Sequence, residues 1–450
     1  MRRKVAIPNG YLAQAKDIME AAGGSIAIKD GGQLYVNPGR SMELPVTVEK
    51  NISAADGAAQ TNWYLLSSPV YNDYYYDDYT DANYNFAFIA TVDNLTKGSY
   101  DMFRYDEPNH KWQNKKAHGA AGFQLMERGR GFLYRNVADQ KIAYTGIISY
   151  GYLNNKNYLL SYTDITGDYA ALKGFNLIGN PYTHNIKKGN AADASISNTY
   201  LETGFYKLSN NGQWAACTDD ETIIGVGEAI LVQATSEANR RCLAFSDVLP
   251  SAGKNRDNND NIMFTVANSQ YSDVTYALFE EGHGLTKIDH RNAEVPMLYI
   301  PKNGENLAIA TMSDNSKVFP LNFKAMTMGN YTIRCQAEGN FNYIHLLDKL
   351  IGEDVDLHLE KEYSFIGAPS DRDDRFVVSL EYYDNSEFSD TFAYQNGTDV
   401  IVSGTGTLQV FDVMGRVVAE QRVNGVQSIT MPQGVYIFRL EGKTQKIVIR

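Results

Sequence analysis

The chain has 450 residues, a formal net charge of −12, and 31 tyrosines and 37 glycines against 12 prolines. A single core stops growing near about 250–300 residues, so this length predicts several domains. The negative charge repels phosphate backbones and disfavours nucleic acid as a partner. No apolar run reaches the roughly 18 residues of a spanning helix, so we expect no membrane span. The tyrosine and glycine content favours strands and turns over helices.

Residues 1–60 predict short strands between tight turns. Apolar and polar residues alternate from Gly23 to Val36, between glycine pairs. Residues 11–22 have a loosely helical spacing of apolar side chains, which allows one short helix. The start, Met1 to Lys4, is similar to the charged region of a signal peptide, but no apolar core follows it. We expect no cleavable signal here, so an exported chain would be a piece of a longer one.

An internal repeat organises residues 61–255. Trp63 to Pro69 and Phe175 to Pro181 share an aromatic residue, a leucine two positions later and a proline six positions later. An aromatic pair nine residues apart follows in each copy, and then a Gly-x-Gly turn that leads into an apolar strand. The turns are Gly129-Arg130-Gly131 and Gly225-Val226-Gly227. We predict one β domain built from two related units.

A third domain is expected over residues 262–384. Residues 251–261 are almost devoid of apolar side chains and predict a linker. Alternating segments such as Ile262–Val266 and Phe376–Leu380 then predict strands, and together they favour a β-sandwich. The cysteines Cys217, Cys242 and Cys335 lack a CxxC spacing, so free thiols are expected, with a disulfide between Cys217 and Cys242 left open.

Residues 385–450 predict a last, small unit rich in hairpins. Leu408–Val413 alternates, a turn follows at Met414, and the segment 435–440 pairs with 445–449 through a glycine turn. The whole chain is therefore expected to be all-β, with several antiparallel β-sandwich modules in tandem. The last module is expected to be a small Ig-like β-sandwich.

This last unit resembles the C-terminal sorting domain of the type IX secretion system of Bacteroidetes. The resemblance rests on the strand and turn Val410–Val418, the turn Pro432–Ile437 and the basic terminal strand Lys443–Arg450. The matching positions form the expected sorting-signal motif: Asp412, Gly415, Arg416, Gly434, Tyr436 and Lys446. The resemblance implies recognition by an outer-membrane translocon and a location that is secreted or on the outer cell surface. The preceding residues are similar to β modules of Bacteroidales surface proteins, and this implies no reaction.

No catalytic, cofactor or metal motif emerges from the sequence. The seven histidines form neither HExxH nor a helically spaced pair, and nucleophile elbows and nucleotide loops are missing. Asp257–Asn261 begins like a calcium loop but lacks its glycine and its bidentate glutamate. Asp371–Arg375 favours a self-paired surface turn. We therefore expect no enzyme activity, no cofactor and no metal.

One segment suggests a ligand contact. Residues 71–84 place six tyrosines among four aspartates, and exposed tyrosines stack on sugars and on protein partners. The candidate contact residues are Tyr74, Tyr75, Tyr76, Asp77 and Asp78. A polar loop with no ligand explains the same composition.

The sequence thus predicts a non-catalytic surface protein exported by the type IX translocon, with a structural or adhesive body. Two alternatives remain open: an adhesin that binds surface glycan or a host protein, and the C-terminal part of a surface hydrolase whose catalytic domain lies upstream. Paired carboxylates for glycoside hydrolysis leave no signature in a single sequence.

Overall fold

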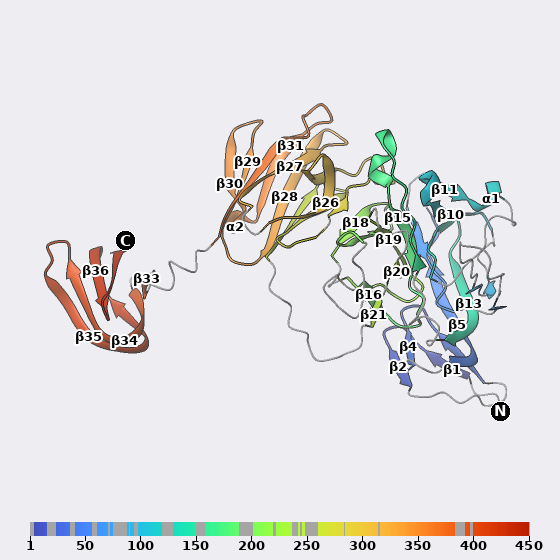
Figure 1. Ribbon diagram of the computed structural model, residues 1–450, viewed down its shortest axis with the longest axis horizontal. Coiled ribbons are helices and arrows are strands. Elements are labelled where there is room, and N and C mark those ends of the chain that lie inside the picture. The colour runs from blue at the N-terminus through green and yellow to red at the C-terminus, as the bar shows by residue number, and fades with distance from the viewer. Residues whose placement is uncertain are drawn as a thin grey trace. The chain divides into compact units, whose positions relative to one another are not determined.

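A computed structural model describes the chain as two compact units, Met1–Leu380 and Glu381–Arg450, here called the body and the tail (Figure 1). The described residues are 4–15, 24–36, 41–55, 61–70, 73–74, 88–89, 91–93, 98–118, 129–149, 158–188, 201–218, 222–235, 242–243, 245–247, 260–282, 284–313, 316–382, 392–396 and 399–449. Both units are built from strands, and the body contains several separate sheets, which confirms the all-β class. No helix in these ranges is long and apolar enough to cross a membrane.

The body begins with a short parallel coil of strands. Its strands are β1 (Lys4–Ile7), β2 (Leu12–Ala15), β3 (Ser25–Ile28), β4 (Gln33–Val36) and β5 (Ser41–Ile52). β1, β3 and β5 pair in parallel, with Val5 opposite Ile26 and Ile26 opposite Val46, so one coil takes 20 or 21 residues. β2 pairs in parallel with β4. Parallel pairing of strands one coil apart is typical of a β-solenoid. Leu12–Ala15 is a strand where the sequence allowed a helix over residues 11–22, and residues 16–22 lie outside the described residues.

Each sequence repeat forms a small sandwich. The first repeat has a sheet of β11 (Lys111–Asn114), β10 (Tyr100–Asp106), β12 (Phe132–Asn136) and β6 (Tyr64–Leu66), packed on β5, β13 (Gln140–Ser149) and β9 (Thr91–Asp93). The second has β18 (Trp214–Cys217), β17 (Phe205–Leu208), β19 (Ala229–Gln233) and β15 (Phe175–Gly179), with the pairs β14 (Tyr158–Leu159) and β20 (Cys242–Leu243), and β16 (Ile186–Lys188) and β21 (Phe245–Asp247). The two four-stranded sheets have the same strand order.

Shorter elements accompany the repeats. They are β7 (Asp73–Tyr74), which pairs with β8 (Phe88–Ile89), the helix α1 (Lys115–His118), and the 3₁₀ turns Glu107–Asn109 and Gly167–Leu172.

The two repeats meet through reciprocal backbone contacts. Gly179 N donates to Gly129 O (3.0 Å), and Ser67 N donates to Gly227 O (3.0 Å), so the two junctions are equivalent. In this register, Gly129 of the first repeat is equivalent to Gly227 of the second. The Gly-x-Gly turns of the sequence predicted that Gly129 is equivalent to Gly225, and that prediction is wrong by two residues. A Cβ at Gly179 would overlap the side chain of Ser67, so this contact requires glycine.

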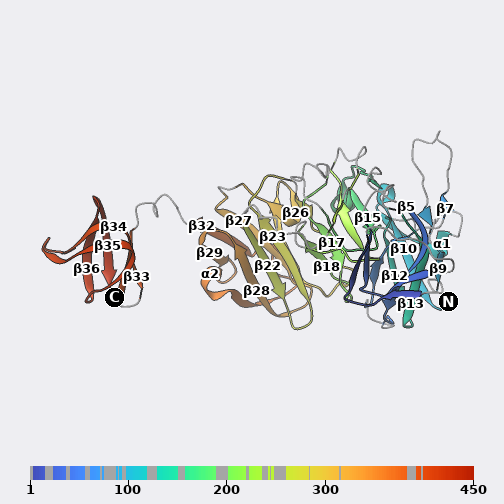
Figure 2. The same ribbon diagram turned by 90° about the horizontal axis from the view of Figure 1, so that it is seen from below.

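The strands from residue 261 onward form a larger sandwich at the end of the body, and the last of them extends two residues past Leu380. Its elements are β22 (Asn261–Ala267), β23 (Ser272–Leu278), β24 (Leu285–Thr286), β25 (Met297–Lys302), β26 (Glu305–Thr311), β27 (Val318–Lys324), β28 (Gly329–Glu338), β29 (Phe341–Asp348), β30 (Glu353–Asp356), α2 (Leu357–Glu360), β31 (Glu362–Gly367) and β32 (Phe376–Tyr382). β23, β22 and β28 lie side by side in Figure 2. Ile262, Phe264 and Val266 are buried at alternate positions of β22, which confirms the predicted strand.

A shared core joins the repeats to this sandwich. Trp63, Leu177 and Trp214 of the repeats pack in one cluster with Leu285 and Ile309 of the sandwich. Trp112 and Trp214, which occupy equivalent strands of the two repeats, stack with their ring centroids 6.3 Å apart. The repeats and the sandwich therefore bury apolar surface against each other, and this burial explains why the body is one compact unit.

The tail is a five-stranded sheet curled around one core. Its strands are β33 (Ala393–Asn396), β34 (Asp399–Asp412), β35 (Val417–Thr430), β36 (Gly434–Leu440) and β37 (Lys443–Ile449). β34 pairs along its length with β35, while its other edge pairs first with β33 and then with β36. Gly404 and Gly406, with φ of 151° and 144°, interrupt the middle of β34, where other residues would be strained.

Gln445 closes the tail by joining β37 to β33. Its Oε1 accepts from Phe392 N (3.1 Å) and Ala393 N (3.0 Å), and its Nε2 donates to Ala393 O (2.5 Å). We predict that Gln445→Ala lowers the free energy of unfolding of the tail by about 2–4 kcal/mol, because buried backbone groups lose their partner. Faster deuterium exchange at residues 392–396 would report the loss. Gln409→Ala, which removes an exposed bond to Glu420, should change stability by less than about 0.5 kcal/mol.

Cys335 is a buried free thiol, as the sequence favours. The side chain of Cys242 lies outside the described residues, as do residues 251–259 of the predicted linker.

Candidate functional site in the tail

The turn between β34 and β35 holds the first half of the predicted sorting motif. Asp412 Oδ1 accepts from Met414 N (2.9 Å) and Arg416 N (3.0 Å), and its Oδ2 lies 2.7 Å from Arg416 Nη2. Gly415 has φ of 79°, a left-handed conformation that favours glycine. Asp412, Gly415 and Arg416 therefore act together: they lock a tight turn at the surface.

Hydrogen bonding also keeps the Asp412 carboxyl of this turn ionised. The N–H of Arg416, together with its guanidinium and the N–H of Met414, lowers the pKa of Asp412. Asp412 is thus ionised at neutral pH, and the Arg416 guanidinium, whose side chain is 77% exposed, is held against it. The turn presents a cation to solvent in a fixed position.

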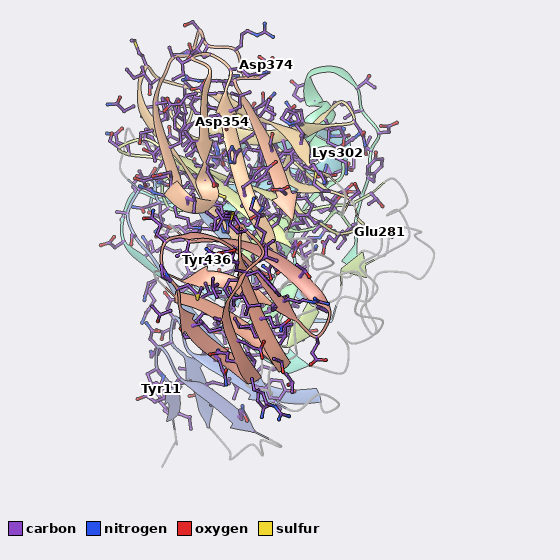
Figure 3. The ribbon with its side chains drawn as sticks, turned by 90° about the vertical axis from the view of Figure 1, so that its left-hand side faces the viewer. Tyr11, Glu281, Lys302, Asp354, Asp374 and Tyr436 are labelled. Atoms are coloured by element: carbon purple, nitrogen blue, oxygen red, sulfur yellow. The ribbon has the colours of Figure 1, made fainter. Side chains whose placement is uncertain are left out.

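The second half of the motif lies on the hairpin of β36 and β37. Gly434 opens β36, and a Cβ there would meet the ring of Tyr436 at 3.1–3.2 Å, so glycine leaves room for that ring. Tyr436 packs against the tail core and is labelled in Figure 3. It pairs in register with Asp412 of β34, which brings the two halves of the motif together. Lys446 is opposite Ile437 on β37, at an exposed position.

Exposed apolar side chains surround the turn. Val413 and Met414 are 74% and 79% exposed at its tip, Val417 and Val418 are 51% and 46% exposed just after it, and Ile437 is 39% exposed on β36. Phe411 pairs with both Val417 and Ile437, so three neighbouring strands contribute to this apolar surface. Exposed apolar patches of this kind mark interaction sites.

The tyrosine-rich segment cannot be placed in the same way. Tyr74 belongs to the short strand β7, while Tyr75, Tyr76, Asp77 and Asp78 lie outside the described residues. The suggested ligand contact at these five residues stays a prediction.

The part of the body that the structure describes contains two clusters of buried charged side chains that the sequence did not reveal. Asp273 contacts Lys287 and His290 between the repeats and the sandwich, and Asp348 contacts Arg375 inside the sandwich. The prediction that Asp371–Arg375 is a self-paired surface turn is wrong for Arg375. Arg372 does pair with Asp374 at the surface, but the side chain of Arg375 is only 4% exposed. In the described residues no group of three or more histidine, cysteine or acidic side chains could hold a metal ion.

A comparison of the chain with protein-family models, curated proteins and solved structures found no match.

Proposed function

We propose that the tail is a recognition module for export by a type IX translocon and that the body is a non-catalytic structural and adhesive module at the cell surface. The observation that carries this proposal is the locked turn of Asp412, Gly415 and Arg416, which pairs with the Tyr436 strand in a unit compact by itself. A translocon must recognise many different passengers, so its signal has to fold without their help. The tail has its own core and meets that requirement.

The apolar surface around the turn supports the same proposal. Val413 and Met414 are held out in solvent by a turn whose backbone is fixed by Asp412. Preorganised apolar groups lose little entropy on binding, so they suit recognition by a partner. The guanidinium of Arg416 beside them adds a charge that orients the contact.

The test is export of the full chain, supplied with an N-terminal Sec signal, in a bacterium that has a type IX translocon. Asp412→Ala releases the turn, and Arg416→Gln removes the cation while leaving both backbone bonds to Asp412. Each change should lower the surface-exposed fraction about tenfold. The surface fraction is measured by protease shaving and the periplasmic fraction by immunoblot.

Glu420→Ala is the matched control, because it removes an exposed acidic residue of β35 outside the motif. It should leave export unchanged. Normal export of both turn variants, or export of a chain that ends at residue 380, would contradict the proposal.

A further inference from the structure

A polar cavity of about 260 Å³ lies in the body, apart from the tail. It forms where the glycine turn between β3 and β4 of the coil meets the loop before β19 of the second repeat. The side chains that matter for its chemistry are those of Lys50, Asn185, Lys207, Ile223 and Glu228. Lys50 and Glu228, which are 178 positions apart in the sequence, thus line the same cavity.

Three charged side chains line the cavity, those of Lys50, Lys207 and Glu228, and Asp30, which is outside the lining, pairs with Lys50. Lys207 Nζ lies 3.0 Å from Glu228 Oε2 and donates to Ile223 O (3.1 Å). Lys50 Nζ lies 3.9 Å from Glu228 Oε1 and 3.2 Å from Asp30 Oδ1. Two ammonium groups and two carboxylates therefore alternate in one row, which has no net charge.

Glu228 is ionised in this setting. Burial opposes its charge, but Lys207, Lys50 and the N–H of Gly225 outweigh burial and lower the pKa of its carboxyl. The row therefore offers fixed hydrogen-bond donors and acceptors next to one another at neutral pH.

The alternation selects the class of ligand. A free anion in the cavity would meet the Glu228 carboxylate, and a free cation would meet the Lys50 and Lys207 ammonium groups, so each would face a like charge. A hydroxyl group both donates and accepts, so neighbouring hydroxyls can accept from an ammonium and donate to the carboxylate beside it. The Asn185 amide has the same double capacity, and Ile223, which is 42% exposed, offers an apolar wall for C–H groups.

We propose that this cavity binds a single neutral hexose unit of a glycan. Vicinal hydroxyls bridge Lys207 and Glu228, Asn185 binds a further hydroxyl, and Ile223 packs against the ring face. The cavity is smaller than the roughly 300–1,000 Å³ of typical drug-sized sites, which suits one sugar ring and not an oligosaccharide. The site does not depend on the proposed role of the tail.

The test uses the full chain and saturation-transfer NMR followed by titration. The neutral probes are glucose, galactose, mannose, fucose and N-acetylglucosamine, and the charged probes are glucuronate and glucosamine. At least one neutral sugar should bind. Lys207→Met and Asn185→Ala should each weaken it by about tenfold, because each removes a hydrogen-bonding group from the site.

The controls separate binding from folding. Asn185→Ala keeps the backbone N–H that donates to Gln33 Oε1 (2.9 Å), so this variant should melt like the parent protein even if Lys207→Met does not fold. Lys116→Met removes a lysine that pairs with Asp101 elsewhere in the body and should bind normally. Absence of binding by every neutral sugar, tighter binding of a charged probe, or full affinity in Asn185→Ala would each overturn the proposal.

Discussion

Asp273→Asn is expected to lower the free energy of unfolding of the body by about 3–5 kcal/mol, because it leaves a buried ammonium without its counter-charge. Asp273 and Lys287 are 0% and 1% exposed, and their charged atoms lie 2.5 Å apart. His290 Nε2 lies 3.3 Å from the same carboxylate, and its Nδ1 accepts from Trp214 N (3.0 Å). Urea unfolding followed by tryptophan fluorescence measures the loss.

The double variant Asp273→Asn with Lys287→Met provides the control. It removes the unpaired ammonium and keeps an amide oxygen that can accept from Leu298 N, so much of the lost stability should return. A cost below about 1 kcal/mol for Asp273→Asn would show that water or a rearranged partner reaches Lys287, contrary to the structure.

The same cluster predicts an acid dependence. Burial opposes the charge of Asp273, but Lys287 and His290 outweigh it and lower the pKa of its carboxyl in the folded state. The stabilisation is therefore complete above the unfolded-state pKa near 3.9 and is lost as the pH falls through the folded-state value. The difference in stability between the parent protein and Asp273→Asn should narrow below about pH 4.

Arg375→Met should cost about 3–5 kcal/mol by the same reasoning, now inside the sandwich. Arg375 Nε and Nη2 donate to the two oxygens of Asp348 (2.9 and 2.7 Å), and Nη1 donates to Ile366 O (2.7 Å). The guanidinium also lies 4.6 Å from the ring centroid of Phe365. Methionine fills the space but leaves the Asp348 carboxylate with fewer donors in the core.

Arg372→Met is the matched control on the same loop. Arg372 is 86% exposed and pairs with Asp374 at the surface, so its loss should cost no more than about 1 kcal/mol. Equal melting temperatures for the two variants would contradict the assignment of Arg375 to the core. Calorimetry of the full chain makes the comparison.

The sequence predicted what depends on local alternation. Ile262, Phe264 and Val266 follow a period of two, and this period places them on one buried face of β22. The similar segments that begin at Trp63 and Phe175 predicted two related units, and these units form sheets with the same strand order. A local pattern is enough to predict a buried strand face, because successive side chains of a strand point to opposite faces of the sheet whichever strand it pairs with.

The sequence did not predict what depends on long-range contacts. Val5 and Ile26 belong to successive coils, but two short apolar strands 21 residues apart give little signal of a repeat. Asp273 and Lys287 are ordinary charged residues until folding buries them side by side. The cavity joins Lys50 to Glu228 only because the coil and the second repeat meet. The predicted sorting motif rests on resemblance alone, and the structure adds the hydrogen bonds of the turn at Asp412.

The parallel coil at the start of the body has a consequence for how its length can vary. Successive coils are joined by parallel strand pairing, as between Val5 and Ile26. An inserted coil of about 21 residues could therefore pair in the same way with the coil before it and the coil after it. Such an insertion would lengthen the molecule by one strand spacing, ~4.8 Å, and leave the junction of β5 with β13 untouched. The length of this region can therefore change in steps of one strand spacing.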